Sequence, residues 1–137
     1  NDTDPPGSYS TYQTLPSFST LESNYPKYGQ QYMNGGLSDM GFAKLVGGKV
    51  QQNIESGMFT NTCALRVSHA LNASGANIPM ESGQTVSSSS KKWYYFRTPM
   101  LNKYLTKTYG KADIVTTNSM DLQAKKGIIF YDTGNFW

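Results

Sequence analysis

The fold of this chain is decided by Gly57–Gly75, with the sequence GMFTNTCALRVSHALNASG. The spacing predicts one short helix, capped by Asn61 or Thr62 at its start and ended by Gly75, which suits the left-handed residue after a last turn. At about 100° per residue, one side of this helix is apolar and the other is polar. The apolar arc holds Cys63, Ala64, Val67, Ala70 and Leu71, and the polar side holds Arg66, Ser68, His69 and Asn72, with Leu65 as an apolar exception.

Cys63, the single cysteine of the chain, falls in the first turn of this helix. Free backbone N–H groups and the positive end of the helix dipole favour a thiolate there, and first-turn N–H groups can also stabilise an oxyanion. The position therefore suits a nucleophile. Cys63 also lies within the apolar arc, and free cysteine is among the most often buried residue types. Position alone leaves both interpretations open and favours the buried, inert one.

His69, the single histidine, is not a suitable proton acceptor for Cys63. It lies six positions later, which places it roughly 240° around the helix and nearly two turns away. The two side chains cannot share a proton. A histidine on a polar helix face, here near Arg66, is expected to be solvated.

Composition excludes several classes of function. The chain has 137 residues, enough for one domain with a real core, and a formal net charge of +3. Its Lys and Arg residues are scattered, so we expect no nucleic-acid partner. No window of about 18 apolar residues would span a membrane. One cysteine forms no internal disulfide, and without a Cys/His cluster we expect neither a metal site nor another cofactor.

Two segments differ in composition. Residues 1–36 are rich in Ser, Thr and Tyr, and we predict an arm that wraps the domain through its tyrosines, with Gly35–Gly36 as a hinge. A disordered or adhesive tail is the alternative. Residues 37–137 are predicted to form the folded domain.

Within the domain, helices precede strands, and this order predicts an α+β fold. Gly127–Tyr131 is the most apolar strand, so it should be central in its sheet, and Ile78–Lys92 is expected to be a mobile polar loop. The remaining predictions are a helix that is capped by Ser38, runs through Val46 and is ended by Gly47–Gly48, and a helix that is capped by Thr98, has Pro99 at its first position and is ended by Gly110. We also predict a short helix or turn at Val50–Ser56, strands at Trp93–Arg97 and Ala112–Thr116, and a helical turn at Ser119–Leu122.

Several fragments of the chain resemble one family in order and spacing. They are Lys44–Gly48, Asn53–Ser68, Leu71–Asn72, Tyr94–Arg97, Tyr104–Lys111, Asp113–Val115 and Lys125–Ile129. Together they resemble the type VI secretion amidase effector 4 family, bacterial toxins with an NlpC/P60-like, papain-like fold in which helices pack on an antiparallel sheet. The resemblance covers roughly Gly41 to Trp137, and the arm before Gly36 is not part of the pattern.

This resemblance implies that Cys63 is the nucleophile of a cysteine peptidoglycan amidase. Family members hydrolyse the amide between D-glutamate and meso-diaminopimelate in cell-wall stem peptides, with a histidine that shuttles the proton and an acidic residue that orients it. It also implies an antibacterial toxin, secreted or delivered to the periplasm of a target cell, with a cognate immunity protein as a partner.

The chain departs from the family at its end. The resemblance places the catalytic histidine a few residues beyond Trp137 and the acidic residue later still, and Asp132 does not match the acid. Residues 37–137 are therefore expected to be the N-terminal part of the domain, with the last strands and the base on a further segment or on a second chain. A non-catalytic cell-wall-binding module and a surface protein with an adhesive arm remain the alternatives.

Overall fold

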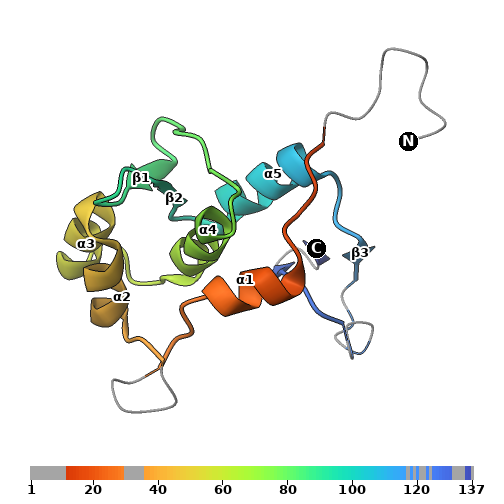
Figure 1. The fold of residues 1–137 in the computed structure, drawn as a ribbon, viewed down its shortest axis with the longest axis horizontal. Helices are drawn as coiled ribbons and strands as arrows, with labels where there is room; N and C mark the ends of the chain where they lie inside the picture. Colours follow the sequence, from red (N-terminus) through yellow and green to blue (C-terminus); the bar gives the residue numbers. More distant parts are fainter. Residues whose placement is uncertain are drawn as a thin grey trace. The chain divides into compact units, whose positions relative to one another are not determined.

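The structure, a computed structural model, describes residues 12–29, 36–116, 118, 120, 123, 125–130 and 135–136. The chain divides into two compact units, one of Pro16–Asn102 and one of Asn1–Leu15 with Lys103–Trp137. Helices come first and most strands follow, so the predicted α+β class is confirmed (Figure 1). The elements are α1 (Phe18–Asn24), α2 (Asp39–Val46), α3 (Gly48–Glu55), α4 (Cys63–Ala73), β1 (Thr85–Ser87), β2 (Trp93–Tyr95), α5 (Thr98–Tyr109), β3 (Ile114–Val115), β4 (Ile129–Phe130) and β5 (Asn135–Phe136).

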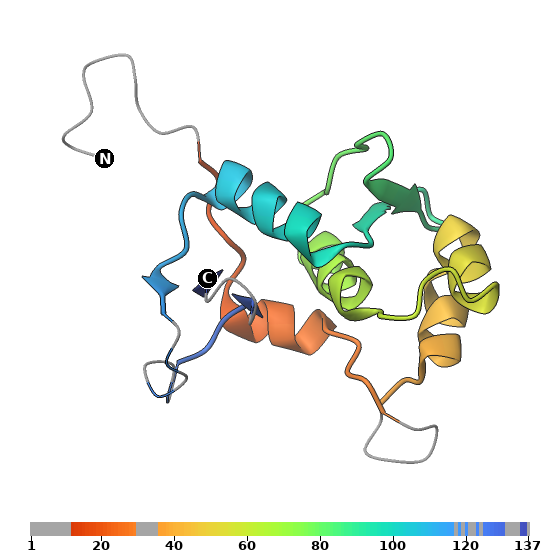
Figure 2. The ribbon, with the colours of Figure 1, turned by 180° about the vertical axis from the view of Figure 1, so that it is seen from behind.

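Helix α4 is the predicted central helix, and it lies between α1 and strand β2 in the larger unit (Figure 2). Gly75 follows it with a φ of 94°, as expected of the residue after a last turn. The polar side of this helix does not face solvent, because Arg66, Ser68 and Asn72 are all buried. A helix covered on several sides has no solvated face, so its polar side chains must find partners inside the protein.

Two of these buried side chains bind the backbone of β2. Ser68 Oγ accepts a hydrogen bond from the Tyr95 N–H over 3.1 Å, and Asn72 Nδ2 donates to the Trp93 carbonyl over 2.7 Å. The spacing explains the fit: residues four apart on a helix are about 6 Å apart along its axis, close to the rise of two residues on a strand. Asn72 Oδ1 also accepts from the Ile78 N–H at 2.9 Å, which fixes the chain after the helix.

Helices α2 and α3 form a pair that packs beside the hairpin of β1 and β2. Ser38 caps α2 as predicted, with its Oγ accepting from the Gly41 N–H at 3.1 Å. Gly47 separates the two helices, and both Gly47 and Gly48, the first residue of α3, have positive φ angles. Apolar residues from α2, α3, α4 and β2 form the core of this unit, namely Phe42, Ala43, Val46, Val50, Ile54, Leu65 and Tyr94.

The prediction of a mobile loop over Ile78–Lys92 is wrong. Strand β1 lies within it and pairs antiparallel with β2, with Thr85 opposite Tyr95. The serine run after β1 is held by hydrogen bonds: Ser88 Oγ accepts from the Lys92 N–H at 3.0 Å, and Ser89 Oγ donates to the Val46 carbonyl at 3.0 Å. Polar composition misled the prediction because these side chains bond to nearby backbone groups instead of water.

Part of the predicted arm is helical. Helix α1, whose cap Ser17 accepts from the Thr20 N–H, packs on α4, so the interpretation as a disordered tail is wrong for this segment. Tyr28 and Leu37 form an isolated parallel bridge. Gly35 of the predicted hinge lies outside the described residues, and the domain boundary between residues 36 and 37 remains a prediction.

Helix α5 matches its prediction within one residue at its start, buries Leu101, Tyr104 and Leu105, and is followed by Gly110 with a φ of 88°. Strands β3, β4 and β5 form an antiparallel sheet in the order β3-β5-β4. The prediction of a central strand at Gly127–Tyr131 is wrong in the described part of the sheet. There the central strand is β5, which pairs with β3 on one side and with β4 on the other.

Two sequence expectations complete the comparison. The helical turn predicted at Ser119–Leu122 lies outside the described residues except for Met120. Among the described residues, every helix is too short or too polar to cross a bilayer.

Gly48→Ala should destabilise the protein strongly, because its φ is 62° and a Cβ there would lie 2.5 Å from the backbone carbon of Ser88. The left-handed backbone costs an alanine about 1–2 kcal/mol, and overpacking adds about 1–3 kcal/mol. Gly83→Ala is the matched control, since its φ is 75° and nothing lies within 4 Å of the added Cβ. Urea unfolding should give Gly48→Ala the larger loss, and equal losses would contradict the close packing of α3 on the β1–β2 turn.

Candidate active site

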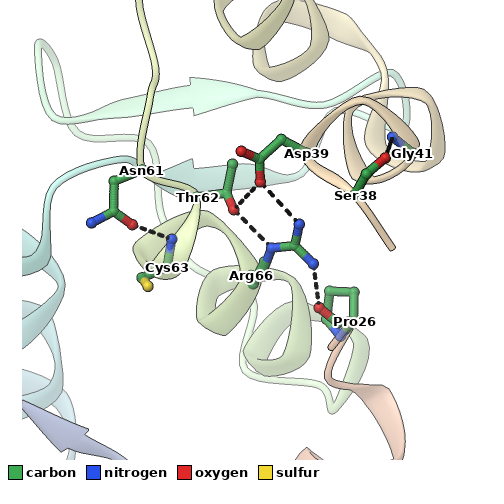
Figure 3. Close-up of polar contacts among 8 residues, drawn as sticks. All are labelled: Pro26, Ser38, Asp39, Gly41, Asn61, Thr62, Cys63 and Arg66. Atoms are coloured by element: carbon green, nitrogen blue, oxygen red, sulfur yellow. Dashed lines mark hydrogen bonds and ion pairs between the residues drawn. The ribbon is translucent and has the colours of Figure 1, made fainter. Parts of the chain in front are cut away.

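Cys63 is the first residue of α4 and is exposed to solvent as a free thiol, so the interpretation as a buried residue is wrong. Thr60 and Asn61, three and two residues before it, are exposed as well, whereas Thr62 is buried. The cap predicted at Asn61 or Thr62 is provided by Asn61, whose Oδ1 accepts a hydrogen bond from the Cys63 N–H over 2.9 Å (Figure 3). The thiol is therefore presented to solvent from a fixed first turn.

The hydrogen bond from the Cys63 N–H to Asn61 changes the expectation of an oxyanion site in the first turn. First-turn N–H groups were expected to be free to stabilise an oxyanion, but the N–H of Cys63 itself is bound to Asn61. In this conformation that group is not available to a substrate. It becomes available when the Asn61 side chain turns away, which an exposed residue can do.

Arg66, one turn after Cys63, is fully buried and binds three segments of the chain (Figure 3). Its Nε donates to Thr62 Oγ1 at 2.7 Å, its Nη1 donates to the Pro26 carbonyl at 2.8 Å, and its Nη2 forms an ion pair with Asp39 Oδ1 at 3.1 Å. Thr62 Oγ1 in turn donates to Asp39 Oδ1 at 2.8 Å. We call Pro26, Asp39, Thr62 and Arg66 the Arg66 network.

Aromatic rings complete the surroundings of the guanidinium. Its central carbon lies 5.0 Å from the ring centre of Phe42 and 5.2 Å from that of Tyr28, within the range of cation–π attraction. The sequence placed Arg66 on the polar side of the helix but did not predict that this side is buried. The signal available in the sequence is the pair Thr62 and Arg66, a hydroxyl and a guanidinium four residues apart on one helix.

Tyr25 lies beside the same network. Burial raises the pKa of its hydroxyl, the charge of Cys63 raises it further, and Arg66 lowers it. Tyr25 directly precedes Pro26, whose carbonyl binds Arg66. A residue that the sequence assigned to the arm is therefore within electrostatic reach of both Cys63 and Arg66.

His69 is half-buried, and the expectation that it is solvated near Arg66 is wrong. Its Nδ1 lies 2.7 Å from the hydroxyl of Tyr94, and its ring meets Phe42 edge-on. Burial lowers the pKa of His69 and raises the pKa of Tyr94 to about 12, so both are neutral near pH 7. In the described part of the chain, no three His, Cys, Asp or Glu side chains lie close enough together to hold a metal ion.

Comparison with known proteins places the chain in a family. Residues 59–135 match the model of Tae4, the amidase effector protein 4 of the type VI secretion system. The chain belongs to this family. No curated protein sequence matches.

Solved structures of Tae4 effectors match the fold. The type VI effector Tae4 from Enterobacter cloacae is 34% identical, with a TM-score of 0.69, over 85% of this chain and 70% of that one. Tae4 from Salmonella typhimurium, in complex with the immunity protein Tai4 from Enterobacter cloacae, is 28% identical, with a TM-score of 0.67, over 88% of this chain and 77% of that one. Tae4 in the Tae4–Tai4 complex from Enterobacter cloacae is 32% identical, with a TM-score of 0.66, over 88% of this chain and 77% of that one.

These matches agree with the predicted NlpC/P60-like α+β fold. They also correct one expectation about the arm. Residues 37–137 are less than three quarters of the chain, so a match over 85% of it extends into the residues before 37. The structural pattern of the Tae4 family thus includes part of the arm, which the sequence fragments left out.

His69 should make stability depend on pH. Since burial lowers its pKa below 6.5 in the folded state, the unfolded chain binds more protons as the pH falls through 6.5, and the free energy of unfolding decreases. In His69→Asn the side-chain oxygen can still bind Tyr94 but does not titrate. Urea unfolding between about pH 8 and pH 5 should show the wild type losing stability relative to this variant. A constant difference across that range would contradict the buried neutral state of His69.

Proposed function

We propose that this chain carries the nucleophile of a peptidoglycan amidase, Cys63, and acts as an antibacterial effector of the type VI secretion system. The observation that carries the proposal is an exposed free thiol on the first residue of α4, in a chain of the Tae4 amidase effector family. The substrate is the stem peptide of the cell wall, and the bond is the amide between D-glutamate and diaminopimelate.

The chemistry follows from the thiol. The Cys63 thiolate attacks the amide carbonyl carbon and forms a C–S bond, and the C–N bond breaks when the leaving amine receives a proton. Water then attacks the thioester and releases the carboxylate and the thiol. The Asn61 side chain turns from the Cys63 N–H as substrate binds, so that this N–H can stabilise the oxyanion.

The base in this mechanism is not His69, whose Nδ1 is bound to Tyr94 on β2. We propose, as the family resemblance implies, that a histidine and an acidic residue outside residues 1–137 complete the site. They are supplied by the same polypeptide or by a second chain.

Partner and location follow from the same family. Solved Tae4 effectors form complexes with Tai4 immunity proteins. We propose that this protein is likewise blocked by a cognate immunity protein and that it acts in the periplasm of a target cell, where stem peptides are accessible.

Cys63→Ala should abolish hydrolysis of purified muropeptides by the full-length protein, a loss of at least about a thousandfold, because no other group of the chain replaces the thiolate. The melting temperature should stay close to that of the wild type, since Cys63 is exposed. Mass spectrometry of the reaction products measures both the loss and the bond cleaved. Turnover by the variant would overturn the proposed nucleophile, and binding without turnover by the wild type would favour a cell-wall-binding module.

His69→Ala should retain wild-type turnover within about threefold in the same assay, because the imidazole is bonded away from the thiol. A loss of several orders of magnitude in a variant that is still folded would make His69 the base and would contradict its pairing with Tyr94.

A further inference from the structure

The Arg66 network joins three segments that are far apart in the sequence. Arg66 donates hydrogen bonds to the Pro26 carbonyl in the arm, to Asp39 Oδ1 in the first turn of α2, and to Thr62 Oγ1 just before α4. A guanidinium that is buried almost completely must be paired, because an unpaired buried charge is costly. These segments are therefore held in one arrangement by one side chain.

Thr62 is the member that connects this network to the nucleophile. Its hydroxyl is both acceptor and donor: it accepts a hydrogen bond from Arg66 Nε and donates one to Asp39 Oδ1. Its carbonyl accepts from the Arg66 N–H at 2.9 Å. Although Thr62 is the residue before the helix, its side chain makes no capping bond, and Asn61 takes that role.

The network does not contact the thiol. Figure 3 shows the Cys63 side chain pointing away from the guanidinium, on the other side of the first turn. The direct structural connection between Arg66 and Cys63 is therefore the backbone of Thr62, which is buried and directly precedes Cys63.

We propose that Arg66 and Thr62 are positioning residues for the nucleophile, and that the Arg66 network makes the arm segment at Pro26 an integral part of the active site. This inference rests on the proposed function for its effect on turnover. Fixing the Thr62 backbone fixes the Cα of Cys63 and thus the direction in which the sulfur meets a bound amide. A displacement of about 1 Å at a nucleophile can cost a hundredfold in rate.

A matched pair of variants tests this in the full-length protein. Thr62→Val keeps the shape of the side chain and removes the hydroxyl, while Thr62→Ser keeps the hydroxyl. Two readouts are followed: kcat and KM on purified muropeptides, and the rate at which iodoacetamide alkylates Cys63 as a function of pH. Thr62→Val should lower kcat at least about tenfold with KM changed by less than about threefold, and should move the alkylation profile. Thr62→Ser should restore both toward the wild type.

A purely structural role predicts a different pattern. If folded Thr62→Val has a lower melting temperature but wild-type kcat and alkylation profile, or if Thr62→Ser is as impaired as Thr62→Val, the proposal is overturned. Where Thr62→Val yields no folded protein, Asp39→Asn decides, since it removes the charge from a partly exposed side chain. A lowered kcat with a moved profile supports the proposal, and wild-type values for both overturn it.

The alkylation readout also separates this inference from the proposed function. If Cys63→Ala still hydrolyses muropeptides, the proposed nucleophile fails, but the alkylation profile of Thr62→Val still shows whether the network controls the thiol.

Discussion

The buried charge of Arg66 is the constraint on which the larger unit depends. Water does not reach the guanidinium, so protein groups must replace it, and they come from the arm, from α2 and from the residue before Cys63. Apolar packing alone would tolerate small shifts of α4 against its neighbours, whereas directional bonds to a buried charge do not. The geometry around Cys63 is thus fixed by polar interactions within a unit whose core is apolar.

The local features of the site were predictable, and the tertiary ones were not. Helix α4, its position after Asn61, its end at Gly75 and the first-turn place of Cys63 all depend on backbone preferences of neighbouring residues. Burial depends on what covers a helix. The sequence showed a polar side at Arg66, Ser68 and Asn72, but it could not show that α1 and β2 cover that side and provide partners.

The same distinction explains why Cys63, on the apolar side, is exposed and Arg66, on the polar side, is buried. Cys63 in the apolar arc was expected from its position to be buried and is exposed, at the first residue of the helix. Arg66, on the polar side, is buried, and one of its acceptors, Thr62, lies one turn away on the same helix. Periodicity describes which residues share a side of a helix, and it does not show what covers that side or its ends.

The bonds from Ser68 and Asn72 to β2 have a consequence for solubility during folding and after it. A two-stranded hairpin such as β1–β2 is marginal by itself and leaves an edge with unpaired N–H and C=O groups that can recruit a strand from another molecule. Here two helical side chains occupy the Tyr95 N–H and the Trp93 carbonyl at the spacing that an incoming strand would use. Helix α4 therefore exposes Cys63 at its first residue and, with its last turns, covers an edge of the hairpin that could otherwise recruit another strand.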